Sequence, residues 1–133
     1  MLMKPIKTET CVAALEAYFK AYDNPRVEAR NALLDRAANV MGQRGLAQQT
    51  FENLADGSIC TMGCLFLAAG LPANPYAAGL NPYLVLGLQD LRDAVSALGY
   101  LVPFPQICAW NNEPGRTKED VVNALLAAKG QPI

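Results

Sequence analysis

The chain has 133 residues, of which 52% are hydrophobic and 17% are charged, and its net charge at pH 7 is −1. This balance is typical of one folded globular domain and excludes an intrinsically disordered chain. Eleven basic residues are scattered among twelve acidic ones, which argues against a nucleic-acid partner. No apolar run reaches the ~18 to 20 residues of a membrane helix, and the N-terminus lacks the apolar segment of a signal peptide. The predicted location is the cytoplasm, without a membrane partner.

The sequence contains no histidine and only two serines. The absence of histidine excludes Ser-His-Asp and Cys-His catalysis, and every metal site that needs a histidine ligand. The glycines at positions 42 and 45 are not followed by the residues of a phosphate-binding loop. These features favour a protein that is not an enzyme and has no cofactor.

The first helix is predicted over residues 8–22. Its apolar residues recur at spacings of three and four, which places them on one face of a helix. That face is expected to turn inward, and its residues are Val12, Leu15, Tyr18, Phe19 and Tyr22. Residues 1–7 are expected to form a loose N-terminal tail.

A second helix is predicted over residues 25–41, with Asn24 as its N-cap and Pro25 at its first position. The same Pro is expected to end the first helix. Arg26 and Arg30 are predicted to face solvent. The residues expected to turn inward are Val27, Leu33, Leu34, Ala37, Val40 and Met41.

Residues 42–57 indicate either a short helix or a docked loop, with a turn at Asp56-Gly57. Residues 58–70 are almost wholly apolar. Their length and their small residues favour a buried central helix over a strand. We expect Ser58 to cap this helix and Gly70 to end it.

Asn81 and Pro82 repeat the N-cap pattern and predict a helix that runs to Gly99. Its core face is expected to consist of Leu84, Leu88, Leu91, Val95 and Leu98. Its opposite, polar face is expected to carry Gln89, Arg92, Asp93 and Ser96.

Pro103 and Pro105 forbid a long helix, so residues 101–110 are predicted to form a Pro-rich extended segment. A final helix is predicted over residues 117–129, with a capping box at its start. Its inward residues are expected to be Val121, Val122, Leu125 and Leu126.

The predicted fold is all-α: a compact single-domain array of five to six helices with one Pro-rich extended segment. Short connections between amphipathic helices favour such an array. The sequence has no internal repeat and no domain boundary, so residues 1–133 are expected to form one helical domain.

The four cysteines are predicted to be reduced thiols among apolar neighbours. Cys60 and Cys64 are four residues apart and would share one face of a helix. One alternative is a structural zinc site formed by these two residues with Cys11 and Cys108. A second alternative makes Cys60 a nucleophile, because it lies near the start of its predicted helix.

The loop before the last helix holds the only tryptophan, and it permits two hypotheses. In the first, Trp110 is a core anchor, Asn111 and Asn112 fit turn geometry, and Arg116 tethers the loop to Glu113. In the second, Trp110, Asn111, Asn112 and Arg116 form a recognition surface, because Trp and Arg are enriched at binding hot spots. The first hypothesis is favoured, and the four residues remain the predicted binding site.

The chain resembles a family of small proteins from bacteria and their phages that is known only as a domain of unknown function. The resemblance spans roughly residues 10–130, and its closing motif is the most specific part. It rests on Asp56-Gly57, Cys60, Gly63-Cys64-Leu65, Trp110-Asn111-Asn112 and Pro114-Gly115-Arg116-Thr117.

Two positions depart from the family pattern: Cys64, where the family tends to have Ala, and Asn112, where it tends to have Asp. If that Asp acted chemically in the family, Asn112 would lack the group. The resemblance implies a phage or mobile-element setting, and it carries over no catalytic residue.

The favoured function is a non-enzymatic accessory factor that binds a cellular or host protein. In a phage setting the target would be a host defence component such as a CRISPR effector, and the chain would be an anti-CRISPR or other anti-defence inhibitor. The alternative is a small-molecule-binding protein or enzyme with a pocket near Trp110 and Cys60. A homodimer is a third hypothesis, because the apolar fraction is high for this length.

Overall fold

The computed structural model describes residues 7–102 and 106–133. These residues form six helices and no strand, which confirms the all-α prediction. Most of the predicted tail, and the prolines of the predicted extended segment, lie outside the described residues. Elsewhere in that segment the prediction of an extended chain is wrong at Leu101 and at residues 107–110, which are helical. The helices are α1 (Thr8–Arg44), α2 (Thr61–Ala68), α3 (Pro82–Leu86), α4 (Gln89–Leu101), α5 (Ile107–Asn111) and α6 (Lys118–Ala128).

Helix α1 is one continuous helix of 37 residues, so the predicted break at Pro25 is wrong. A Pro inside a helix removes one hydrogen bond, here the bond that the carbonyl of Ala21 would accept. Both residues are exposed, so water can replace the missing donor. The local start signal at Asn24 is therefore overridden by a helix that is already formed on both sides.

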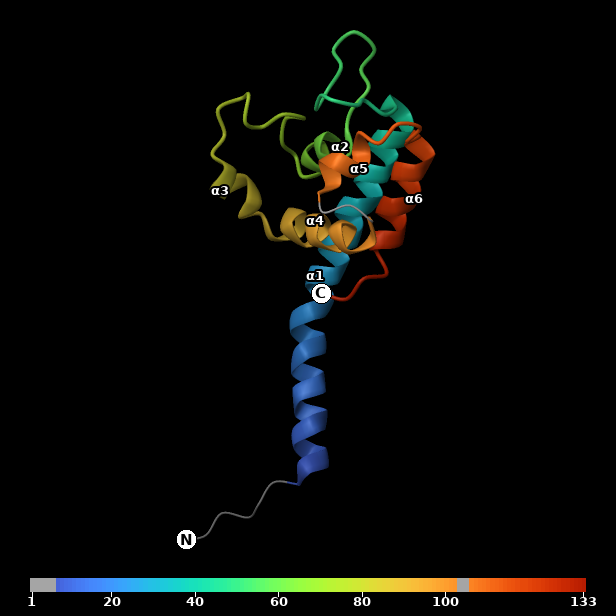
Figure 1. Cartoon of the computed structure of the whole chain (residues 1–133). Coiled ribbons are helices and arrows are strands. Elements are labelled where there is room, and N and C mark those ends of the chain that lie inside the picture. Colours follow the sequence, from blue (N-terminus) through green and yellow to red (C-terminus); the bar gives the residue numbers. More distant parts are fainter. Residues whose placement is uncertain (1–6, 103–105) are drawn as a thin grey trace.

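The N-terminal half of α1 projects away from the other helices (Figure 1). The prediction that its apolar face turns inward is wrong, because every side chain from residue 7 to residue 22 is exposed. We call this face the N-terminal stripe, and it consists of Val12, Leu15, Tyr18, Phe19 and Tyr22. In the part of the chain that the structure describes, no helix is both long and apolar enough to cross a membrane.

The remaining described residues, from Pro25 onward, form the helical body. Helices α2, α4 and α6 all pack against the C-terminal half of α1. The predicted inward residues of that half are confirmed at Leu33, Leu34, Ala37 and Met41, which are fully buried. Helix α6 is confirmed with its capping box between Thr117 and Asp120, although Leu126 is exposed rather than inward.

Two arginines of α1 were predicted to face solvent, and both contact the body instead. Arg30 is only 1% exposed, and its Nη2 donates to the backbone oxygen of Lys129 at the end of α6 (3.1 Å). Arg26 donates to both carboxylate oxygens of Asp93, at 3.2 and 2.8 Å. Asp93 was predicted to lie on the exposed, polar face of α4, but it is buried. Its burial is tolerated because its carboxylate accepts these two bonds and a third from Gln89.

Helix α2 is the buried central helix that the sequence predicts, but its cap is Cys60 rather than Ser58. The Cys60 sulfur accepts a hydrogen bond from the backbone N–H of Gly63 (3.2 Å). Ser58 is instead bonded to Asp56. A side chain at Gly63 would meet the Phe51 oxygen at 2.7 Å, so only glycine allows the loop to lie this close to α2.

The helix predicted from Pro82 to Gly99 is divided into α3 and α4 at Gly87 and Leu88. Asn81 caps α3 as expected, because its side chain accepts from the backbone of Tyr83. The break gives α3 a direction different from that of α4, and Leu84 is 72% exposed and Leu88 is also exposed. Of the predicted core face, Leu91 and Leu98 are fully buried and Val95 is partly buried.

Candidate functional site

The segment between α1 and α2 is a docked loop that folds back on itself. Hydrogen bonds from Cys60 N to Phe51 O and from Asn53 N to Ser58 O, both 2.9 Å, hold its two arms together. Leu54 lies between these arms and is 88% exposed. The loop lies at the opposite end of α1 from the projecting half (Figure 1).

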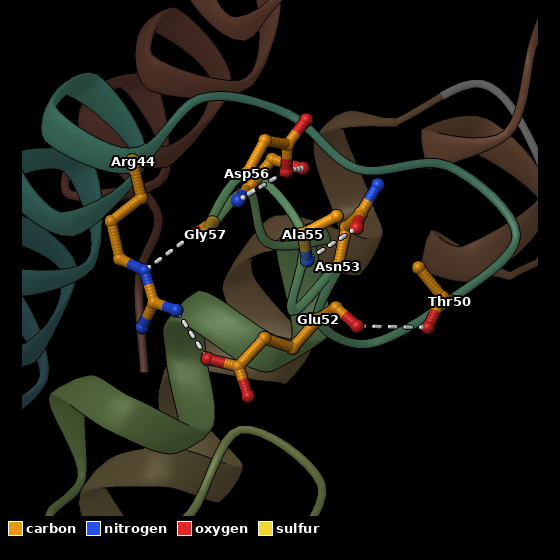
Figure 2. Close-up of polar contacts among 8 residues, drawn as sticks. Arg44, Thr50, Glu52, Asn53, Ala55, Asp56 and Gly57 are labelled. Carbon is orange, nitrogen blue, oxygen red and sulfur yellow. Dashed lines mark hydrogen bonds and ion pairs between the residues drawn. The ribbon is translucent and has the colours of Figure 1, made fainter.

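Arg44, at the end of α1, fixes this loop (Figure 2). Its Nε donates to the backbone oxygen of Gly57 at 2.7 Å, and its Nη2 forms an ion pair with Glu52. Asp56 accepts hydrogen bonds from the Ser58 hydroxyl (2.6 Å) and backbone N–H (2.9 Å), which lower the pKa of Asp56. These side-chain bonds therefore add to the backbone bonds and to the core packing of Ile59 that hold the loop.

Asn111 joins this region to α5. Its Oδ1 accepts from the Thr61 backbone N–H (2.8 Å) and hydroxyl (2.7 Å), and its Nδ2 donates to the Ala47 oxygen (3.0 Å). The side chain is only 1% exposed. Since both ends of the amide are occupied by protein groups, Asn111 positions the site and has little capacity left for a ligand.

Asn112 lies beside it and is partly exposed. Its Oδ1 accepts from the backbone N–H of Gln49 at 2.8 Å and from the Asn111 side chain at 3.1 Å. Gln49 has a φ of 66°, which is unusual for a residue with a side chain. The Asn112 contact stabilises this backbone conformation.

Trp110 and Arg116 form a separate pair. The Arg116 guanidinium lies 4.2 Å from the centroid of the Trp110 ring, and its Nε donates to the Trp110 backbone oxygen at 3.0 Å. Trp110 is buried, as predicted for a core anchor. Arg116 is joined to Glu113 only through its backbone N–H, which donates to the Glu113 oxygen at 3.1 Å, because its side chain turns to Trp110 and, at 3.8 Å, to Asp120.

A cavity of about 200 Å³ lies between the loop, α2 and α5. Two of the predicted site residues line it, Asn111 and Asn112, whereas Trp110 and Arg116 do not. Its lining residues are Gln49, Thr50, Phe51, Cys60, Met62, Cys108, Asn111 and Asn112.

Three sulfur-containing side chains face this cavity: Cys60, Met62 and Cys108. Burial raises the pKa of the Cys60 thiol, which disfavours the thiolate that a nucleophile needs. Cys64 points into the core and donates to the Thr61 oxygen at 3.0 Å, and burial raises its pKa further. Cys60 is therefore the thiol that both caps a helix and lines the cavity.

The structure does not bring the four cysteines into one metal site. Cys11 lies on the projecting half of α1, whereas Cys60 and Cys64 are buried in the body. Within residues 7–102 and 106–133, no group of three or more Cys, Asp or Glu side chains could hold a metal ion.

Sequence reasoning missed four residues of the cavity: Gln49, Thr50, Phe51 and Met62. The loop that carries three of them has no periodic pattern, and its position depends on bonds to residues about 60 positions away, such as Gln48 to the Asn111 oxygen (3.1 Å). The one local signal was the Asp56-Gly57 turn, which indicates that the chain reverses but not where it docks.

Residues 25–131 match a family of unknown function, DUF6197, and the chain belongs to this family. The matched region begins at Pro25, so the N-terminal stripe lies outside it while the cavity and the Trp110 loop lie inside it. No curated protein and no solved structure matches the chain.

Proposed function

We propose that this chain is a non-enzymatic accessory protein that binds another protein through the N-terminal stripe. One observation carries the proposal: five large apolar side chains are fully outside the body on one face of α1. Contiguous exposed apolar surface on a folded protein marks an interaction site.

The composition of the stripe supports a protein partner. Tyr and Phe are enriched at the buried centre of interfaces, because they bring a large area with little loss of side-chain freedom. The rings are already ordered, with Tyr18 stacked on Tyr22 at 6.4 Å between centroids and on edge to Phe19 at 5.7 Å.

The helix is also prepared for binding. The projecting half of α1 would be only marginally stable in water as an isolated short helix. Here it continues a helix whose other half is packed in the body. A partner therefore does not have to nucleate it, which lowers the ordering cost of association.

The setting that we propose is a phage or mobile element of bacteria, on the resemblance described above. The target would then be a host defence component such as a CRISPR effector. Expression of the chain in a host with active CRISPR immunity should restore plaque formation by a targeted phage. Unchanged plaque counts across the effector types would remove this setting and leave the binding surface to be tested separately.

The binding surface is tested with two matched variants of the full chain. Leu15→Gln with Phe19→Gln alters the stripe, and Ala13→Gln with Ala17→Gln places the same residues on the opposite face of α1. Both keep good helix formers. A photo-crosslinker at Tyr18 should capture a partner from host lysate, and the stripe variant should weaken capture by at least about tenfold. Equal capture by both variants would contradict the proposal.

The cavity supports a second candidate, a small-molecule-binding protein. Its volume of about 200 Å³ is below the ~300–1,000 Å³ typical of drug-sized ligands, so it would suit a smaller molecule with an apolar body. The amides of Asn112 and Gln49 would supply the polar contacts. A small-fragment screen should then give melting shifts that Thr50→Trp abolishes by filling the cavity. Shifts that persist in this variant would place the ligand elsewhere.

A further inference from the structure

We infer that the partner of the N-terminal stripe is an amphipathic helix whose apolar face is bordered by lysines or arginines. The inference rests on the proposed function and adds the chemistry of the partner. It comes from the charges that border the stripe.

Three acids form a row along one side of the stripe. Glu9, Glu16 and Asp23 are each seven residues apart, so they lie above one another on the helix. Glu16 follows Val12 by four residues and precedes Phe19 by three, so the row runs directly beside the apolar side chains.

The row is only partly offset from within the helix. Lys20 is the only cation among residues 8–24, and it lies four residues after Glu16 and three before Asp23, on the side away from the stripe. Arg26 lies over the Tyr22 ring, 5.9 Å from its centroid, but its guanidinium is bonded to Asp93. Residues 8–24 therefore carry three negative charges and one positive charge, and a partner that covers the stripe meets this net negative charge.

Beyond Lys7 at the N-cap of α1, the opposite side of the stripe is small and uncharged over residues 8–24. Ala14 and Ala21 precede and follow Tyr18 by four and three residues, so they border the Tyr18 side of the stripe. Small residues let a second helix approach closely here. The acidic row and the alanine side of the stripe differ in charge. A bound helix must therefore carry its cations on the side that faces the acidic row.

The spacing of the apolar residues selects a helix as the partner. Val12, Leu15, Phe19 and Tyr22 follow the alternating three- and four-residue steps of a coiled-coil seam. The seam extends over about three turns, or about 16 Å. A basic amphipathic helix can lay its own seam along it and place cations against the acids.

A second copy of this chain fits less well. In an antiparallel pair the acidic row would face itself, with Glu16 opposite Glu16 and Glu9 opposite Asp23. In a parallel pair the row would face the Tyr18 side, whose one cation among residues 7–24 is Lys7 at the start of α1. Like charges across a helix pair are destabilising. The same row repels nucleic acid and anionic membranes.

The test uses the full chain and two synthetic helical peptides with identical leucine seams. One peptide has Lys at the border positions and the other has Gln. Fluorescence anisotropy at low salt should give about tenfold tighter binding of the Lys peptide, as expected for three exposed ion pairs. The difference should shrink in high salt, because salt screens exposed charges.

Two variants with the same change in net charge assign the effect to the row. Glu9→Gln, Glu16→Gln and Asp23→Asn should remove the preference for the Lys peptide. Thr10→Lys, Ala17→Lys and Asn24→Lys add three positive charges at positions that are not three or four residues from any acid of the row, and this variant should keep most of the preference for the Lys peptide. Circular dichroism checks that both variants retain the helix.

Each contrary outcome has a definite meaning. Equal binding of both peptides by the native chain overturns the basic-helix inference and leaves a protein-binding stripe intact. Binding of neither peptide also overturns it, and the capture experiment then decides the proposed function. A dimer in sedimentation that Leu15→Gln with Phe19→Gln dissociates also overturns it, because the occupant is then a second copy.

Discussion

Asn111 uses both ends of its amide to join three segments that are far apart in the sequence: α5, the start of α2 and the loop at Ala47. Its replacement would leave buried backbone groups of two segments without partners. Such groups are expensive to bury, because they lose their bonds to water as well.

Asn111→Ala is therefore expected to destabilise the fold by about 3 kcal/mol in urea unfolding. Asn112→Ala is the matched control, since this side chain is only partly buried and makes fewer bonds. It should cost about 1 kcal/mol. Similar losses for both variants would show that the hydrogen bonds of Asn111 to the three segments contribute no more to stability than those of Asn112.

Gly63→Ala tests the close approach of the loop to α2. An added Cβ would lie 2.7 Å from the Phe51 oxygen and from Cγ1 of Ile59, so something must shift. We expect a loss of about 1–3 kcal/mol in the free energy of unfolding. Gly42→Ala is the control, because its Cβ meets nothing within 4 Å, and it should stabilise α1 by about 0.5–1 kcal/mol.

The thiols are expected to react with iodoacetamide in a definite order. Cys11 and Cys108 are exposed and should be alkylated first. Burial raises the pKa of Cys60, so the thiolate fraction at a given pH is lower and its alkylation should accelerate only as pH rises above the usual thiol range. Cys64 should react only on unfolding. Mass mapping of labelled peptides across pH checks the order.

At the scale of elements, α2 and α6 could be predicted from the sequence because their signals are local. The capping box at Thr117 and the apolar run after residue 58 need no distant partner to be recognised. The burial of Arg30 could not be predicted, because the carbonyl that it bonds is 99 residues away.

The apolar faces of α1 and α3 that were wrongly predicted to turn inward have one physical cause in common. Periodicity identifies an apolar face but does not say whether another element covers it, as the exposed Leu84 and the N-terminal stripe show. The cavity was missed for a similar reason, since its walls come from three segments brought together by long-range hydrogen bonds. Asn111 and Asn112 were found only because Asn is frequent at turns.

Pro25→Ala tests the continuity of α1. The substitution restores a backbone donor to the Ala21 carbonyl and removes the clash of the Pro ring, so the helix should become locally more stable. Amides near the junction, from Ala21 to Ala29, should exchange more slowly with solvent. Unchanged exchange rates would indicate that the two halves of α1 form independently.

At the scale of the whole molecule, the fully buried side chains among residues 7–102 and 106–133 all lie from Arg30 onward. A chain that starts at Pro25 should therefore keep its core. We expect its free energy of unfolding in urea to stay within about 0.5 kcal/mol of that of the full chain, as for changes at exposed positions. A much larger loss would show that the projecting half supports the body.

The length of α1 has a geometric consequence. A helix of 37 residues spans about 55 Å and turns by about 100° at each residue. The helix therefore sets both the distance of the N-terminal stripe from the body and the direction in which the stripe faces. Arg44 clamps its far end to the loop at Gly57. One residue inserted near Glu28 would rotate the stripe about the helix axis by about a quarter of a turn relative to the body. An insertion of seven residues would move the stripe farther from the body and nearly restore its original orientation.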